Sequence, residues 1–359
     1  MDVAGVDSLA KPLSDATSDA TPARRSLAHG LVLFLFYWAL YGLSLLGAVG
    51  PLPLATNVLF SVLNGVFIAM LFIIGHDCCH GALVPGRSLN LWLGRIAFLP
   101  IGHSVSLWRF AHNGLHHRRN NLSGVDPVWA PMSLADYRKA SAARQLLERI
   151  YRSPFGPAVY YYAGIWVSWM LVPLTPPTLK RWKQHLPDTI FVLLGFAALV
   201  ATSGVLGHWL APSRPLWLEI ALGWALPFAV WNYLGALSFY LNHTHPDIPW
   251  FDNESDWKAH GGGVSGTAHV KMPIDLLPLY SAAMAHPAHH ADPLTPAYDL
   301  PEHQSVLKKR RENQTTDYML SLGEYRRIVK ICKLFDHDRM CWTDFSGNPT
   351  TGRLIPATS

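Results

Sequence analysis

The chain has 359 residues, of which half are hydrophobic and only 15% are charged. A soluble domain normally carries about a quarter charged residues, so this composition argues against a soluble enzyme and favours a membrane protein. The net charge of +5 would also suit a nucleic-acid-binding protein, but the basic residues form no stripe with interleaved aromatic residues, so we expect no nucleic-acid partner.

Four long hydrophobic segments follow an N-terminal stretch. Residues 1–28 are rich in Ala, Ser, Thr and Asp and contain no hydrophobic run, which predicts a disordered tail. Each long segment is close to the ~20 residues that a helix needs to cross a bilayer. Short turns join the first segment to the second and the third to the fourth. We therefore predict an all-α integral membrane protein with four transmembrane helices in two hairpins, at residues 31–49, 54–75, 189–211 and 216–241.

Two weaker hydrophobic segments lie between the hairpins, at residues 89–107 and 155–175. Arg95 and Pro100 interrupt the first, and the second is crowded with Tyr, Trp and Pro, which suits a membrane interface. We interpret both as helices that lie on the membrane surface or insert halfway. The chain then divides into the tail, one membrane-bound domain over residues 29–310, and a cytosolic C-terminal extension over residues 311–359.

The distribution of Lys and Arg predicts the orientation. With four spans, 28 of the 29 basic residues lie on one side of the membrane, and Arg214 alone lies on the other. The positive-inside rule makes the populated side the cytoplasm, so we expect both termini there. We expect a bacterial inner membrane, with the endoplasmic reticulum as the alternative, because the chain is compact and shows no obvious retention signal.

Ten of the 18 histidines gather in four clusters, all on the predicted cytosolic side. The clusters are His76–His80, His112–His117, His243–His245 and His286–His290. Residues three and four apart share a helix face, so the two histidines of the first cluster, or the three of the last, can aim at one point. His112 and His116 share a face, whereas His117 is turned by about a third of a circle and could serve a second metal.

This arrangement indicates a metal site, because imidazole suits iron, zinc and copper. Eight or nine ligands are too many for one ion and about right for two. A helix from Ala55 to His80 would be about 39 Å long against a ~30 Å hydrocarbon core, so it would hold its histidines outside the membrane. The absence of H-E-x-x-H and of Glu-x-x-His excludes a zincin and a carboxylate di-iron bundle.

A metal or solute transporter is the alternative from another functional class. Transporters place ionisable groups at the middle of their spans, often in broken helices. Ionisable residues are almost absent from the four spans predicted here, which argues against transport.

The histidine clusters resemble the three histidine boxes of the integral-membrane fatty acid desaturases, H-x(3,4)-H, H-x(2,3)-H-H and H-x(2,3)-H-H. Here the boxes are His76–His80, His112–His117 and His286–His290. The chain is most similar to the oleate-type (omega-6) branch, whose Q-H-T-H-P stretch is matched by Asn242–Pro246 and whose Pro-x-Tyr-x-Leu pattern is matched by Pro296–Leu300.

The resemblance implies two iron ions, held by the eight box histidines and by a ninth ligand after the fourth span. That ninth ligand is His243, with His245 as the less favoured choice, and Asp77 and Asp126 occupy positions that orient ligand imidazoles. The implied reaction is the desaturation of a fatty acyl chain with O₂ as co-substrate. The acyl chain is linked to lipid, CoA or a carrier protein, and a separate cytochrome or ferredoxin supplies electrons.

Three residues depart from the pattern of the branch. Cys79 stands where Gly is usual, Gly81 follows His80 where His is common, and Pro287 replaces an apolar residue. Relatives with altered boxes include hydroxylases and acetylenases. Those reactions, and other alkyl or carotenoid oxygenation at the same di-iron site, are therefore the alternatives to desaturation.

Overall fold

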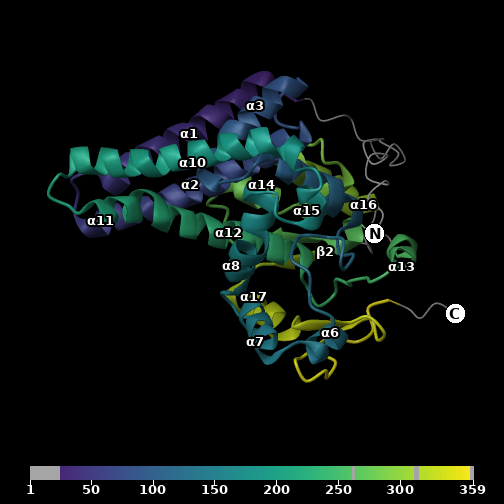
Figure 1. Cartoon of the computed structure of the whole chain (residues 1–359). Helices are drawn as coiled ribbons and strands as arrows, with labels where there is room; N and C mark the ends of the chain where they lie inside the picture. The colour runs from purple at the N-terminus through teal and green to yellow at the C-terminus, as the bar shows by residue number, and fades with distance from the viewer. Residues whose placement is uncertain (1–24, 261–262, 311–314, 356–359) are drawn as a thin grey trace.

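A helical arm projects from a lobe that contains the rest of the chain (Figure 1). The computed structural model describes residues 25–260, 263–310 and 315–355. Each helix of the arm is long and apolar enough to cross a membrane, so the predicted hairpins are confirmed. The arm consists of α1 (Leu27–Val49), α2 (Leu54–His80), α10 (Trp182–Leu210) and a fourth helix formed by α11 (Leu216–Ile220), the π-helical turn η5 (Ala221–Ala225) and α12 (Leu226–His243).

Polar side chains tie the two hairpins together at the far end of the arm. The Asn57 side-chain amide donates to the carbonyls of Gly47 and Gly50 at 2.8 and 2.9 Å, which fixes the first turn. The Arg214 guanidinium donates to the Gly50 carbonyl at 3.1 Å and to Asn57 Oδ1 at 2.9 Å. The one basic residue predicted on this side of the membrane therefore joins the turn of one hairpin to that of the other.

Short helices build the part of the lobe that lies between the hairpins in the sequence. They are α3 (Arg87–Ala97), η2 (Leu99–Ile101), α4 (Val105–Trp108), η3 (Arg109–His116), α5 (His117–Arg119), α6 (Leu134–Lys139), α7 (Ala142–Tyr151), α8 (Gly156–Tyr160), η4 (Tyr161–Leu171) and α9 (Pro176–Leu179). The first weaker segment forms α3 to α4, and Leu89, Trp92 and Ile96 of α3 expose hydrophobic side chains. The second forms α8 and η4, whose Tyr161 and Trp166 are buried.

The remaining elements follow the fourth span. They are α13 (Glu254–Ala259), η6 (Val264–Gly266), β1 (Ala268–Lys271), α14 (Pro278–Ala283), α15 (His286–Ala291), η7 (Ala297–Asp299), α16 (Leu300–Arg310), β2 (Thr316–Met319), α17 (Leu322–Ile331), β3 (Leu334–Asp336) and β4 (Cys341–Thr343). β1 pairs with β2 in parallel, and β3 pairs with β4 in antiparallel fashion. These short strands were not expected in a chain predicted to be all helical.

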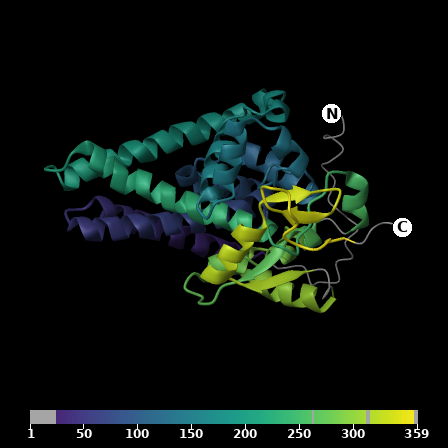
Figure 2. The same cartoon turned by 90° about the horizontal axis from the view of Figure 1, so that it is seen from below.

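The C-terminal residues pack against the lobe (Figure 2). Besides the β1–β2 pairing, the Trp342 indole N–H lies 3.1 Å from the carbonyl oxygens of both His245 and Ile248. The residues after 314 therefore contact the residues that directly follow the fourth span. Of the predicted N-terminal tail, residues 1–24 lie outside the described part of the chain, and α1 already begins at Leu27.

The membrane orientation can be tested by cysteine labelling. All four native cysteines are buried and free, so a single introduced thiol can be labelled selectively. Ser213→Cys, at the far end of the arm, and Ser346→Cys, in the lobe, should react from opposite sides of the membrane in intact cells or vesicles. Reaction of both from the same side would contradict the four-span topology.

Candidate metal centre

The nine histidines predicted as ligands converge where the arm meets the lobe, and they form two groups. The first contains His76, His80, His112, His117 and His289. The second contains His116, His243, His286 and His290. Within each group, one ring nitrogen per residue lies within 4.8 Å of all the others. Each of the three boxes contributes to the first group, and the second and third boxes also contribute to the second.

Ring nitrogens of the first group lie at distances typical of a shared ion. His112 Nε2 is 3.0 Å from the Nε2 atoms of both His76 and His117, and His117 Nε2 is 2.9 Å from that of His289. Two nitrogens bound to one metal at about 2.0–2.1 Å lie roughly 3 Å apart when their bonds are near a right angle. His80 Nε2 is buried without a hydrogen-bond partner among the described residues, so a metal would satisfy it.

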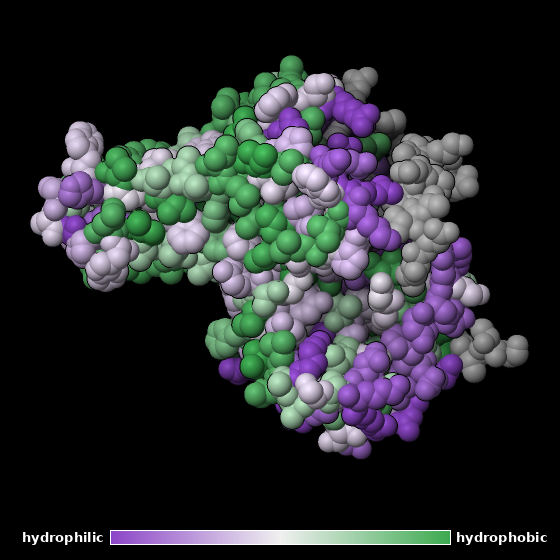
Figure 3. Space-filling model, viewed as in Figure 1, coloured by the Kyte–Doolittle hydropathy of each residue, from purple (hydrophilic) through white to green (hydrophobic). Residues whose placement is uncertain are grey.

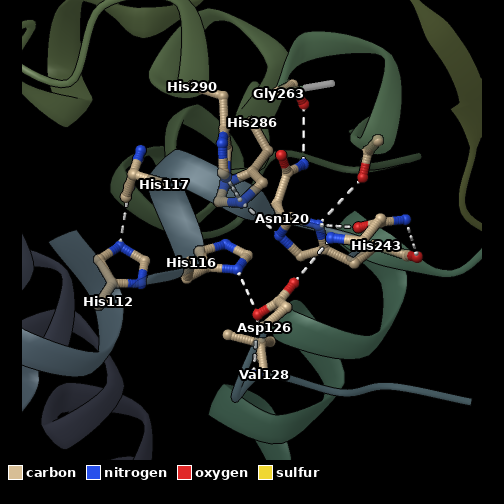
Figure 4. Close-up of polar contacts among 12 residues, drawn as sticks. His112, His116, His117, Asn120, Asp126, Val128, His243, Gly263, His286 and His290 are labelled. Carbon is tan, nitrogen blue, oxygen red and sulfur yellow. Dashed lines mark hydrogen bonds and ion pairs between the residues drawn. The ribbon is translucent and has the colours of Figure 1, made fainter. Parts of the chain in front are cut away.

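Ring nitrogens of the second group lie at similar distances from one another. His286 Nε2 is 2.9 Å from that of His243 and 3.2 Å from that of His290 (Figure 4). The ring of His116 stands 4.5 Å from that of His243 and 4.9 Å from that of His290, measured between centroids. The two groups adjoin, because the stacked rings of His117 and His290 are only 4.3 Å apart. The residues present thus fit two neighbouring ions with imidazole ligands.

The expected sharing of helix faces is wrong for the second box. His112 and His117 meet in the first group, whereas His116 points into the second. The cause is η3, a π-helix in which the His117 N–H donates to the carbonyl of His112, five residues earlier. This wider turn brings the fifth residue back onto the face of the first, which α-helical spacing does not predict.

The histidines of the third box are also divided between the two groups, although all three were expected to meet at one point. His286 and His290 enter the second group, and His289 enters the first. On the short helix α15, adjacent residues point about 100° apart, so His289 and His290 face the two groups on either side. One helical turn therefore serves both groups.

Burial keeps most of these imidazoles neutral, which is the form that binds metals. Desolvation and neighbouring imidazoles hold pKa values well below the ordinary histidine value for His112, His117, His286, His289 and His290.

Two buried aspartates contact the histidine groups from outside. Asp126 Oδ1 lies 2.9 Å from His116 Nδ1, and the same carboxylate accepts the backbone N–H groups of Asn121 and Val128 at 2.8 and 3.0 Å. Burial raises the pKa of Asp126, but the attraction of His116 and His243 together with the hydrogen bonds from His116 and the Val128 N–H outweigh it, so the pKa lies below its ordinary value. The ionised carboxylate thereby directs the other His116 nitrogen toward the second group.

Asp77 links the first box to a segment far along the chain. Its Oδ1 lies 3.3 Å from His76 Nδ1, and its Oδ2 accepts the backbone N–H of Ala297 at 2.7 Å. Ala297 belongs to the Pro-x-Tyr-x-Leu stretch, so this carboxylate fixes that stretch against α2.

Sequence reasoning missed the groups that orient His243. Its Nδ1 lies 3.1 Å from the Gly266 carbonyl oxygen and 3.3 Å from Asn121 Oδ1. Asn121 is buried and has a φ of 59°, a left-handed conformation that Asn tolerates better than most residues. Only the preference of Asn for such a turn could have indicated this residue.

His245 lies outside both groups. Its Nδ1 accepts the backbone N–H of Asp247 at 3.2 Å, and its Nε2 lies 3.2 Å from an Arg327 nitrogen and 3.5 Å from Glu324 Oε1. Its ring stacks on Tyr318 with centroids 4.8 Å apart. This histidine therefore binds the C-terminal segment, whereas His243, at the end of α12, faces the other three histidines of the second group.

A narrow cavity adjoins the histidine groups and runs between α2, α12 and α14. Four of the grouped histidines, His76, His112, His286 and His289, form part of its wall. The rest of the lining is mostly hydrophobic and includes Ala69, Phe72, Ile73, Trp231, Phe239 and Leu300. A hydrocarbon chain could lie in this space with one of its carbons against the histidines.

Comparison with known proteins places these observations in a family. The sequence model of the family "Fatty acid desaturase" matches residues 51–319. A chloroplastic omega-6 fatty acid desaturase of Brassica napus is 26% identical over 77% of this chain and 59% of its own length. An sn-1 oleoyl-lipid 12-desaturase of Synechocystis sp. is 27% identical over 76% of this chain and 74% of its own. A second cyanobacterial protein of that name, from Picosynechococcus sp., is 26% identical over 83% of this chain and 82% of its own.

The chain thus spans about three fifths of the length of the chloroplastic relative. The matched region contains all nine grouped histidines, Asp77 and Asp126, and it extends from the first interhelical turn into β2. The chain belongs to the fatty acid desaturase family.

Proposed function

We propose that the protein holds two iron ions in its two histidine groups and desaturates a fatty acyl chain with O₂ as co-substrate. The observation that carries this proposal is the pair of adjoining imidazole groups in the wall of a hydrophobic cavity. The cyanobacterial relatives are named for an oleoyl-lipid substrate and for the 12 position. We propose the same for this chain: a lipid-linked oleoyl group that gains a double bond at carbon 12.

The irons, when bound, would supply the oxidising power to remove two hydrogens from neighbouring methylenes. The protein would hold the chain in the cavity so that the reacting carbons lie against His76, His112, His286 and His289. Hydrophobic residues such as Phe72 and Trp231 would exclude water from the reacting carbons. Asp126 and Asp77 would hold His116 and His76 in position.

The departures from the family pattern are compatible with desaturation, because none displaces a ligand. Gly81 caps α2 with a φ of 74°, a conformation that favours glycine. Pro287 stands in the first turn of α15, where proline is well tolerated, and it leaves His286 in the second group.

The proposal extends to the membrane, the orientation of the chain and the electron donor. We propose that the lobe and both termini lie in the cytoplasm, that the membrane is a bacterial inner membrane, and that residues 29–310 form the desaturase domain. A separate cytochrome or ferredoxin would deliver the two electrons that each turnover requires. The distribution of Lys and Arg supports the orientation.

Fatty acid analysis of a bacterial host tests the proposal. Expression in cells that are supplied with oleate and a compatible electron donor should yield the product with a second double bond at carbon 12. Hydroxylated or acetylenic products would favour the alternative reactions. No new product, from iron-loaded protein with a working donor, would contradict the proposal.

The shape of the cavity leads to a prediction about chain length. Ala69 is buried in the cavity wall two helical turns from His76, at about 10 Å along α2. Ala69→Leu should shorten the accepted chain beyond the reacting carbons and lower oleate conversion roughly tenfold, with iron content unchanged. Profiling with chains of different length checks this. An unchanged preference would show that the acyl chain does not reach Ala69.

A further inference from the structure

Hydrophobic side chains are exposed on the loop that precedes α14. Ile274 is 68% exposed and Leu276 is 80% exposed, although both residues are outside the arm. The loop, residues 272–277, connects β1 to α14. Neighbouring exposed hydrophobic residues of this size usually mark an interaction surface.

Two further exposed hydrophobic residues continue this surface. Leu322 is 64% exposed and Phe155 is 73% exposed. The backbone N–H of Leu320 donates to the carbonyl of Lys271 at 2.8 Å, which places the start of α17 beside the start of the loop. The Tyr325 hydroxyl of α17 donates to the carbonyl of Pro154, which places Phe155 beside α17. We name Ile274, Leu276, Leu322 and Phe155 the lobe rim.

The lobe rim is on the side of the lobe that a membrane would face. α8 and α17 lie on the side from which the arm projects (Figure 1), and hydrophobic residues gather there in continuation of the arm (Figure 3). The helices of the arm are long and apolar enough to cross a bilayer, and with the arm in a membrane this side of the lobe would face the adjoining leaflet.

The loop also leads directly into the wall of the acyl cavity. Tyr280, Ala283 and Met284, at and just beyond α14, line the cavity opposite α2 and α12. The Tyr280 hydroxyl lies 2.6 Å from Ser238 Oγ and 3.1 Å from the Leu234 carbonyl oxygen, so it fastens α14 to the fourth span. α14 therefore joins the loop to the wall of the cavity.

We propose that residues 272–277 lie in the leaflet next to the lobe and that the acyl chain enters the cavity there, directly from the bilayer. This inference rests on the proposed function and adds the route by which the lipid-linked acyl chain reaches the cavity. Asp275, between the two hydrophobic residues, is exposed, and its carboxylate would lie at the level of the lipid headgroups.

Spin labelling tests the position of the loop independently of activity. Nitroxides are attached to Leu276→Cys and, as a matched control, to Ser346→Cys in the protein reconstituted into phosphatidylcholine vesicles. Collision of the 276 label with O₂ should exceed collision with a water-soluble nickel complex, and the 346 label should show the reverse. A 276 label that behaves like the 346 label overturns the proposal, whatever the activity of the enzyme.

Kinetics test the entry route. Ile274→Asn/Leu276→Asn should raise the KM for lipid substrate in vesicles roughly tenfold, with unchanged iron content and unchanged turnover of an acyl substrate presented in detergent. The control is Leu294→Asn, at an exposed leucine outside the lobe rim. Equal KM values for the double variant and the wild type would overturn the entry route. Absence of product from the wild type, with the 276 label in the bilayer, would instead contradict the proposed function alone.

Discussion

His243→Ala is expected to abolish product formation and to remove the ion from the second group, whereas His245→Ala should keep both ions and part of the activity. His243 Nε2 lies 2.9 Å from His286 Nε2, and His243 belongs to a group of only four imidazoles. His243→Ala would leave three of the four imidazoles proposed to hold the second ion, whereas His245→Ala removes none of them. Iron content by elemental analysis and product yield, measured on the same purified protein, check both expectations.

The effect of His245→Ala should be indirect. This side chain holds Arg327, Glu324 and Tyr318 against the segment that follows His243, and its burial makes the loss cost about 1–3 kcal/mol of folding free energy. His245→Gln, which can keep some of these hydrogen bonds, should restore stability and activity. If His245→Ala loses the iron and His243→Ala keeps it, the two assignments are reversed.

Asp126→Ala should weaken metal binding at the second group by about 10- to 100-fold, the usual effect of removing a carboxylate that orients a ligand imidazole. The substitution frees His116 to turn and leaves the backbone N–H groups of Asn121 and Val128 buried without their acceptor. The second effect should lower the free energy of unfolding by a further ~1–3 kcal/mol per group. Metal titration of the purified protein and thermal unfolding with bound metal check the two effects.

A matched substitution separates orientation from stability. Asp126→Asn keeps one acceptor oxygen, which can serve one of the two backbone N–H groups, and loses the charge beside His116. It should therefore lose less stability than Asp126→Ala and still bind the second ion more weakly. Wild-type metal affinity in Asp126→Asn would show that the carboxylate has only a structural role.

The sequence predicts the parts of this structure that depend on composition and on regular periodicity. The four spans follow from the length of the hydrophobic segments. The second helix was predicted to run from Ala55 to His80, and α2 does end at His80. The convergence of all nine histidines could also be predicted, because each of them follows a span or belongs to a box matched to the family.

Other features could not be predicted because they depend on local departures from regular helices or on contacts distant in sequence. The π-helical turn of η3 places His117, in place of His116, in the same group as His112, and no residue pattern predicts this turn. The β1–β2 pairing brings residue 316 beside residue 268, and Trp342 contacts the His245 carbonyl across nearly a hundred residues. Hydrophobic spacing alone does not predict such contacts between short, mostly polar segments.

The most direct measurement is the metal content of the full-length protein, purified anaerobically and supplied with iron. We predict about two irons and little zinc per chain, since the two groups offer nine imidazoles in all. Zinc can bind such ligands at least as tightly as iron(II), so both metals must be quantified on the same sample. A protein that holds one zinc and no iron, yet is folded and has all nine histidines intact, would contradict a di-iron oxidase.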